Sequence, residues 1–522
     1  MKSRKTKQEQ GITLIALVIT IVILIILATV SINVVLGEGG LIQRAQQAKD
    51  LTEQAALEEQ QGLNSLMSEY ANIMAEDQTP PEPDVPYVDE SIAVAPQVSE
   101  GMTPVKYDTK QNKWVRTDET DNTWYNYANK EWANVVLGGA TFNDGVLDES
   151  KTYSMLVWIP RYAYKITSQY HQGGAGAGEI DIVFIDTANK GKDGKVTYST
   201  TYPSATTGGA MSDYVVHPAF DYGGTALPGF WVGKFETSHT GCTTDKSTGQ
   251  TDTNVTTLTP QIKAGVTSWR SIRVTNIFTV CTEMNKEGNP YGLSSNDNEV
   301  DPHMMKNSEW GAVAYLSQNA TYGKGEEVWI NNSSDFITGS AGNSVSASQD
   351  TGTTNDYKST QGQNASTTGN VTGVYDMSGG AWEYVAAYIN NSYVQSGQNP
   401  YTYGQSLIDS VNAGNTKYAD VYKVTSDSQS NNYNNAQPTQ RQGTPTKDTG
   451  HYGDAVWETS SSASSSSGSW YSDYSDFPFT SHPFFFRGGY CNVGTRAGVF
   501  YFNGNSGGSY SNYSFRVVVP VL

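Results

Sequence analysis

The strongest constraint in this sequence is an uncharged apolar run near its N-terminus, residues 12–36. A helix over this run would extend about 37 Å, enough to cross a bilayer with some tilt. The basic residues before it, Lys2, Arg4, Lys5 and Lys7, place the N-terminus inside the cell by the positive-inside rule. The run exceeds the roughly 7–15 apolar residues of a cleaved secretory signal. We therefore expect a transmembrane helix over 12–36 in a single-pass cell-membrane protein with an extracytoplasmic C-terminal domain.

The junction between the basic leader, residues 1–11, and the apolar run has the pattern of a processing signal. Gly11 ends the leader and Ile12 opens the run. This pattern resembles the signal of type IV prepilins and pseudopilins, in which a dedicated peptidase cleaves after the glycine. The resemblance implies a prepilin-type peptidase acting between Gly11 and Ile12. That family carries Glu at the fifth mature position, where this chain has Ala16, and the departure argues against a pilin or pseudopilin subunit that assembles into a filament.

Two segments separate this run from the rest of the chain. Residues 37–76 place apolar side chains at steps of three and four, which predicts a helical stalk. The stalk either packs on its own neighbours or acts as a pilin-like oligomerisation helix. Residues 77–104 contain Pro80, Pro81 and Pro83 among acidic residues, and this composition predicts an extended, acidic linker.

Composition narrows the fold and partners of the remainder. The net charge of −19 argues against nucleic acid as a partner, because phosphate binding needs a surplus of Lys and Arg. Charged residues make up only 16% and aromatic residues 11%, which favours loop-rich β structure over a helical bundle. The three cysteines form no metal-site spacing, and Cys242–Cys281 is the better candidate for a single disulfide.

Motifs in the C-terminal part follow a specific order, after a Trp- and Tyr-rich β region at 105–224. They are FWVGKFET (230–237), MKNSEWGAVAYL (305–316), GVYDMSGGAWEY (373–384), FRGG (486–489) and SFRV (514–517). This order resembles the formylglycine-generating enzyme or sulfatase-modifying factor family, a branch of the C-type lectin folds. The resemblance covers residues 225–522 and implies an α+β, loop-rich, C-type-lectin-like domain. Residues 105–224 either form an N-terminal part of this domain or lie beside it as a separate region. Within it we expect a strand over 230–237 and a helix over 305–316 capped by Asn307 or Ser308.

The resemblance does not extend to the family's catalytic residues. Its copper-dependent oxidases use two cysteines after the R-G-G motif, and here that segment holds only Cys491. The six histidines also lack the spacing of an iron site. We therefore expect a binding protein rather than an enzyme, with an enzyme of the sulfatase-modifying type and a non-standard site as the alternative. No motif identifies a cofactor, and calcium stays open.

The segment from 488 to 516 has the composition of a binding surface. Small and apolar residues alternate with Tyr, Asn and Ser, the residue types that give antibody paratopes their contact area and adaptable hydrogen bonds. The segment resembles the variable region of proteins diversified by retroelements, which also end in a C-type lectin fold; an ordinary terminal hairpin is the plainer interpretation. We expect an unidentified surface or extracellular ligand, protein or glycan, to contact Tyr490, Cys491, Asn492, Thr495, Arg496, Tyr501, Asn503, Asn505, Ser509, Tyr510 and Asn512.

Overall fold

The computed structural model forms two compact units, Met1–Pro83 and Asp84–Leu522, and each is described by itself. The structure describes these residues: 14–36, 48–49, 51, 54–55, 59–60, 62–63, 86–191, 194–203, 206–207, 209–242, 254–350, 354–424, 428–438 and 451–522.

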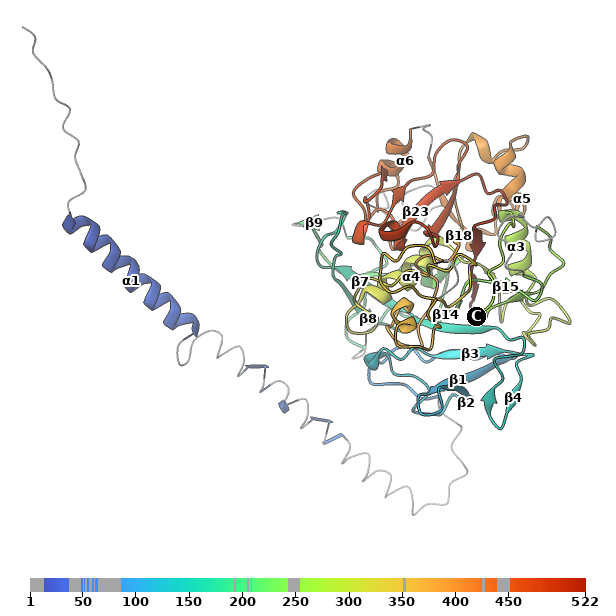
Figure 1. Cartoon of the computed structure of the whole chain (residues 1–522), viewed down its shortest axis with the longest axis horizontal. Helices are drawn as coiled ribbons and strands as arrows, with labels where there is room; N and C mark the ends of the chain where they lie inside the picture. Colours follow the sequence, from blue (N-terminus) through green and yellow to red (C-terminus); the bar gives the residue numbers. More distant parts are fainter. Residues whose placement is uncertain are drawn as a thin grey trace, which may run out of the picture. The chain divides into compact units, whose positions relative to one another are not determined.

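The first unit contains helix α1, Leu14–Leu36 (Figure 1). Among the residues that the structure describes, no helix has both the length and the apolar character to cross a membrane. This finding corrects three expectations: the transmembrane helix over 12–36, the cell-membrane localisation, and residues 12–36 as a contact with the membrane.

Other expectations for this unit fall outside the described residues. They include the leader at 1–11 with the processing residues Gly11 and Ile12. Of the expected stalk at 37–76, nine residues between 48 and 63 are described, and all of them are helical.

The second unit is built around a nine-stranded antiparallel sheet (Figure 1). Its strands, in spatial order, are β17 (His303–Met304), β25 (Val517–Val519), β14 (Gly229–Gly233), β6 (Met155–Pro160), β3 (Asn134–Leu137), β1 (Met102–Asp108), β2 (Lys113–Arg116), β5 (Val146–Leu147) and β4 (Phe142–Asn143). The last strand of the chain, β25, pairs beside β14, with Val232 opposite Val518. The sheet therefore joins the expected β region at 105–224 to the C-terminal motifs.

A mixed sheet of seven strands carries the C-terminal segment. Its path is β19 (Asp420–Tyr422), β18 (Trp382–Ile389), β22 (Phe484–Gly488), β23 (Gly498–Asn505), β21 (Ser475–Asp476) and β20 (Ser464–Ser465), and β24 (Tyr513–Phe515) pairs with β18. The smaller sheets are β11 (Val215–Val216) with β7 (Tyr162–Ile166) and β8 (Ile180–Phe184), β9 (Thr206–Thr207) with β10 (Ala210–Met211), β12 (Asp221–Tyr222) with β13 (Thr225–Ala226), and β15 (Ser238–His239) with β16 (Pro260–Gln261).

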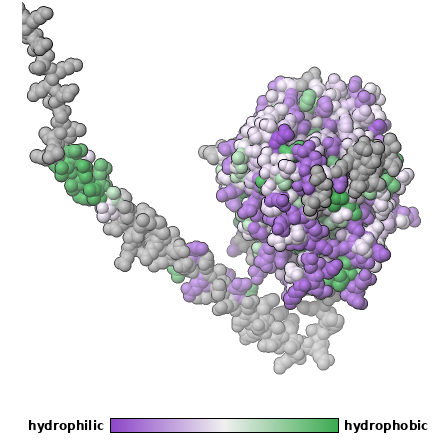
Figure 2. Space-filling view, viewed as in Figure 1, coloured by the Kyte–Doolittle hydropathy of each residue, from purple (hydrophilic) through white to green (hydrophobic). Residues whose placement is uncertain are grey.

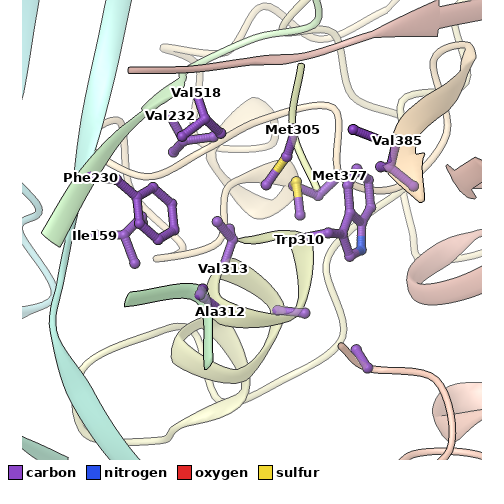
Figure 3. Packing of buried hydrophobic residues seen from close by; sticks show 14 of the residues in the cluster. Ile159, Phe230, Val232, Met305, Trp310, Ala312, Val313, Met377, Val385 and Val518 are labelled. Atoms are coloured by element: carbon purple, nitrogen blue, oxygen red, sulfur yellow. The ribbon is translucent and has the colours of Figure 1, made fainter. Parts of the chain in front are cut away.

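Helix α4, Asn307–Gln318, lies at the centre of the unit, and all its residues are buried. Figure 3 shows Ala312 and Val313 of α4 close to Ile159, Phe230, Val232 and Val518 of the nine-stranded sheet. On the side of the seven-stranded sheet, the Trp310 indole N–H donates to the carbonyl of Val499 at 2.7 Å. Because both faces of the helix are covered, it joins the two sheets into one core.

The remaining helices of the described residues are shorter or peripheral. The α-helices are α3 (Val274–Thr282), α5 (Asn399–Asn412) and α6 (Gln429–Asn435). The 3-10 helices are η1 (Tyr127–Asn129), η2 (Pro218–Phe220), η3 (Gly362–Ala365), η4 (Ser392–Val394), η5 (Thr416–Tyr418), η7 (Trp470–Ser472) and η8 (Gly494–Arg496). Figure 2 shows a predominantly polar surface on the second unit.

Three local expectations differ from the structure. Helix α4 has Lys306 as its N-cap instead of the expected Asn307 or Ser308, because the Glu309 carboxylate accepts from the Lys306 backbone N–H at 2.8 Å. The described part of the expected linker, 86–104, packs on the sheet: the indole N–H groups of Trp158 and Trp231 donate to carbonyls within it. Each cysteine is a thiol, so the expected Cys242–Cys281 disulfide is wrong; Cys281 is fully buried in α3.

Candidate functional site

The C-terminal segment enters the candidate site from β22 and returns to it in β23 and β24. β22 pairs with β23 in an antiparallel register that places Phe486 opposite Asn503. β24 runs parallel to β18, with Tyr513 beside Trp382. Between β22 and β23 the chain turns through Gly488 and Gly489, whose φ angles are 83° and 74°. Glycine permits these left-handed conformations at little steric cost.

A group of aromatic rings from four strands, here called the aromatic layer, underlies the segment. It comprises Trp382 and Tyr384 of β18, Phe486 of β22, Tyr501 of β23 and Tyr513 of β24. The ring centroids of Trp382 and Phe486 lie 5.3 Å apart, and Tyr513 lies 4.9 Å from each of Trp382, Tyr384 and Phe486. Such aromatic pairs add roughly 0.5–1.5 kcal/mol each beyond the burial of their area. The layer is therefore a rigid support.

A tight turn before β18 positions Trp382 in this layer. Asp376, Gly379 and Gly380 have φ angles of 62°, 78° and 67°. The Asp376 carboxylate accepts from the Gly339 N–H and the Asn331 amide at 2.9 Å, and the Ala381 N–H donates to Glu236 at 2.8 Å. These contacts explain the Asp and the glycines of the motif GVYDMSGGAWEY (373–384), because only a compact turn leaves room for the buried carboxylates.

Several predicted site residues lie directly on the aromatic layer. Tyr501, Asn503 and Asn505 alternate along β23 and so share one face of the sheet. The Asn503 amide donates to the Tyr501 hydroxyl at 3.2 Å, and the Asn505 amide donates to the Tyr513 hydroxyl at 3.0 Å. Tyr490 packs on Trp382 with ring centroids 4.3 Å apart. The structure therefore brings Tyr490 and the three residues of β23 together on the aromatic layer.

The accessible predicted residues follow the two connecting loops. Asn492, Thr495 and Arg496 are exposed on the loop that contains η8. On the loop between β23 and β24, Tyr510 is 42% exposed, and Ser509 and Asn512 are half-buried. The Tyr510 ring lies 5.2 Å from Tyr513, and the Asn512 carbonyl accepts from the Trp382 N–H at 2.9 Å. Both loops are thus anchored to the aromatic layer.

Two of the predicted contact residues are not accessible. Cys491 is completely buried against Phe336 and Ala381, and its backbone N–H donates to the Gly380 carbonyl at 3.0 Å. Tyr501 is only 3% exposed because Phe486 and Tyr474 cover its ring. Both side chains support the site from beneath instead of contacting a ligand. The two-residue period of a strand over FYFNGN (500–505) predicts that Tyr501 shares a face with Asn503 and Asn505. It does not predict which residues cover the Tyr501 ring.

Burial sets the protonation state of the tyrosine hydroxyl groups in the aromatic layer. Burial raises the pKa of Tyr501, Tyr513 and Tyr384 well above the ordinary tyrosine value, so their hydroxyl groups stay protonated at neutral pH. The hydroxyl groups therefore act as hydrogen-bond donors and acceptors. Within the ranges that the structure describes, no three His, Cys, Asp or Glu side chains are arranged to hold a metal ion.

Sequence comparisons add no relative: no protein-family model matches the chain, and no curated protein matches it significantly.

Proposed function

We propose that the second unit binds a ligand non-covalently through the accessible residues over the aromatic layer. This surface, here called the C-terminal face, consists of Tyr490, Asn492, Thr495, Arg496, Asn503, Asn505, Ser509, Tyr510 and Asn512. The observation that supports this proposal is that two Tyr and two Asn side chains, from two loops and one strand, contact the aromatic layer: Tyr490, Tyr510, Asn503 and Asn505. Rigid aromatic support with adaptable polar contacts is the chemistry of antibody paratopes.

The preorganisation of the face supports the proposal energetically. Ordering a loop on binding costs free energy, and a loop that is already anchored avoids much of that cost. The Tyr384 hydroxyl shares its one proton between two acceptors, Asn505 Oδ1 at 2.9 Å and the Gly508 carbonyl at 3.0 Å, which fixes the loop that presents Tyr510. The loop is therefore held in place before a ligand arrives.

The test compares two triple variants of the full chain. Labelled wild-type protein is applied to a glycan array and to an array of cell-surface proteins, and every bound probe is measured again with Tyr510→Ala/Asn492→Ala/Arg496→Ala. The matched control, Tyr401→Ala/Asn143→Ala/Arg116→Ala, removes the same residue types elsewhere on the unit. We expect the first variant to lose roughly tenfold or more in affinity, since one such anchor alone contributes 1–2 kcal/mol or more, and the control to bind as wild type. Equal binding by both variants contradicts the proposal.

The retroelement-like pattern gives the proposal a second consequence. If the segment is diversified, substitutions among isolates of one lineage should concentrate at the accessible positions of the C-terminal face. The buried Cys491 and Tyr501 should accept only residues that still pack there. Sequencing the encoding locus with its flanking DNA measures this, and a uniform segment without a neighbouring reverse transcriptase rejects diversification while leaving ligand binding to the array experiment.

A further inference from the structure

The second unit contains a cavity of about 560 Å³, and no residue of the C-terminal face lines it. Its wall comes from the β12–β13 hairpin, the N-terminus of α4, the end of α5 with η5, and loops near 189, 200 and 452. Known small-molecule sites have volumes of roughly 300–1,000 Å³. The size therefore suits a ligand of two or three linked rings.

The lysines of the cavity are already paired with carboxylates behind its wall. Lys306 Nζ lies 3.2 Å from Glu309 Oε1, and Lys417 forms an ion pair with Asp301. Both ammonium groups also lie over the ring of Tyr222, at 5.2 and 5.0 Å from its centroid. Because each positive charge is balanced locally, the lysines offer little net attraction to an anionic ligand.

The N-terminus of α4, which would otherwise favour an anion, is already occupied. The Ser308 N–H donates to Asp420 Oδ2 at 2.6 Å, so a carboxylate of the protein itself satisfies the helix dipole. A second carboxylate, Asp221, lies exposed in the β12–β13 hairpin on the cavity wall. Burial lowers the pKa of His217 to about 3, so this wall residue carries no charge at neutral pH. These groups disfavour a phosphate or carboxylate ligand.

Arg161 lines the cavity, and contacts within the protein hold its guanidinium group in place. Its Nη1 donates to the carbonyls of Phe220 and Leu227, and its Nη2 donates to Asn189. Although only 3% of Arg161 is exposed, its Nε has no hydrogen-bond partner among the described residues. This Nε has almost no accessible surface, so Arg161 shapes the wall through its Nη contacts with Phe220, Leu227 and Asn189.

We propose that this cavity binds a neutral, polyhydroxylated ligand, namely a short saccharide. The balanced lysines and the two wall carboxylates disfavour an anionic ligand. Thr201 and Thr416 line the cavity with hydroxyl groups that can donate and accept, and Asp221 and Asp420 line it with carboxylate acceptors, so its wall can pair with the hydroxyl groups of such a ligand. The site is separate from the C-terminal face, and either can fail without the other.

Strand β13 supplies a matched pair of variants. Ala226 lines the cavity and pairs with Asp221, whereas its neighbour Thr225 pairs with Tyr222 and is not part of the lining. Both side chains are exposed, and successive strand residues point to opposite faces. Ala226→Trp therefore fills the cavity, and Thr225→Trp places the same bulk outside it. Thr201→Trp fills the cavity from another segment.

The measurement is saturation-transfer NMR on the full chain with lactose, maltose and di-N-acetylchitobiose, and with glucose 6-phosphate as an anionic probe and choline as a cationic probe. We expect at least one neutral disaccharide to receive saturation from wild type and Thr225→Trp, and to lose roughly tenfold or more in affinity with Ala226→Trp and Thr201→Trp. Transfer to the charged probes alone, transfer to none, or unchanged transfer in both cavity-filling variants overturns the proposal. The Tyr510→Ala/Asn492→Ala/Arg496→Ala variant should still bind the disaccharide, which distinguishes this site from the C-terminal face.

Discussion

Arg516 and Glu383 form an ion pair in the core, with Nη2–Oε1 at 2.6 Å and Nε–Oε2 at 3.0 Å and both side chains almost completely buried. Arg516 also acts electrostatically on two further buried carboxyl groups, Glu236 and Asp376, which hold the turn before Trp382. Burial raises the pKa of all three carboxyl groups, and that of Glu383 to about 7. The cluster therefore contains three carboxyl groups and one guanidinium group, and the positive charge of Arg516 acts on all three.

This imbalance predicts an asymmetry between the two partners. Arg516→Met leaves three buried carboxyl groups without their cation and should lower the free energy of unfolding by about 3–5 kcal/mol. Glu383→Gln keeps hydrogen-bonding atoms near Arg516, and Glu236 and Asp376 still balance its charge, so the loss should be about 1–2 kcal/mol. Guanidinium unfolding at pH 7 measures both, and a loss in Glu383→Gln as large as in Arg516→Met contradicts this account.

The pH dependence of stability follows from the buried carboxyl groups. Burial raises the pKa of Glu327 from 4.5 to about 7. The folded state therefore keeps a proton that the unfolded state loses near pH 4.5, so this stabilisation is complete below pH 4.5 and is lost as the pH rises through 7. Glu327→Gln should then raise the free energy of unfolding at pH 8 by about 1 kcal/mol and flatten the decline between pH 4.5 and 7.

The neighbouring Glu326 is the control for this prediction, because its side chain is exposed. Glu326→Gln should leave both the stability at pH 8 and the slope unchanged. Urea unfolding between pH 4.5 and 8 gives the two curves. If Glu327→Gln and Glu326→Gln have the same slope, burial of Glu327 does not control the pH dependence.

The support of the C-terminal face can be tested with two hydroxyl deletions. Tyr384→Phe removes the buried donor to Asn505 and Gly508 and should cost about 1–2 kcal/mol, because both acceptors lose a partner. Tyr510→Phe removes an exposed hydroxyl group and should cost below about 0.5 kcal/mol. Hydrogen exchange should show faster opening of 506–512 in Tyr384→Phe alone; equal exchange in both variants contradicts the anchoring role.

The sequence predicts individual elements where a local pattern decides them. The apolar residues Trp310, Val313 and Ala314 within 305–316 predict α4 with an error of two residues at each end. Pro160 ends β6, after which the Arg161 N–H donates to the Pro228 carbonyl and the chain enters a different sheet as β7, a position at a strand end that suits a residue without an N–H. The alternation in 230–237 predicts β14, although the strand ends at Gly233.

Long-range pairings are the part that sequence patterns do not reveal. Nothing local to residues 491 and 501 indicates that Cys491 and Tyr501 are covered, because Phe336, Phe486 and Tyr474 come from distant segments. The cavity is likewise lined by segments between 161 and 452 that share no motif. The Asp420 carboxylate at the N-terminus of α4 is a contact over more than a hundred residues. Such features depend on packing, which composition and periodicity do not specify.

The three thiols provide a final prediction about access to the C-terminal face. Cys281 and Cys491 are fully buried, and burial raises the pKa of Cys281 well above its ordinary value, whereas Cys242 is partly exposed. A chromogenic disulfide reagent should therefore modify Cys242 first and the other two only after denaturation. In a Cys242→Ser background, Tyr490→Ala should make Cys491 react in the native state, because Tyr490 packs against the cluster that contains it. Slow modification of Cys491 in that double variant would show that Tyr490 does not cover it. The control is Cys242→Ser/Tyr510→Ala, in which Cys491 should stay unreactive in the native state.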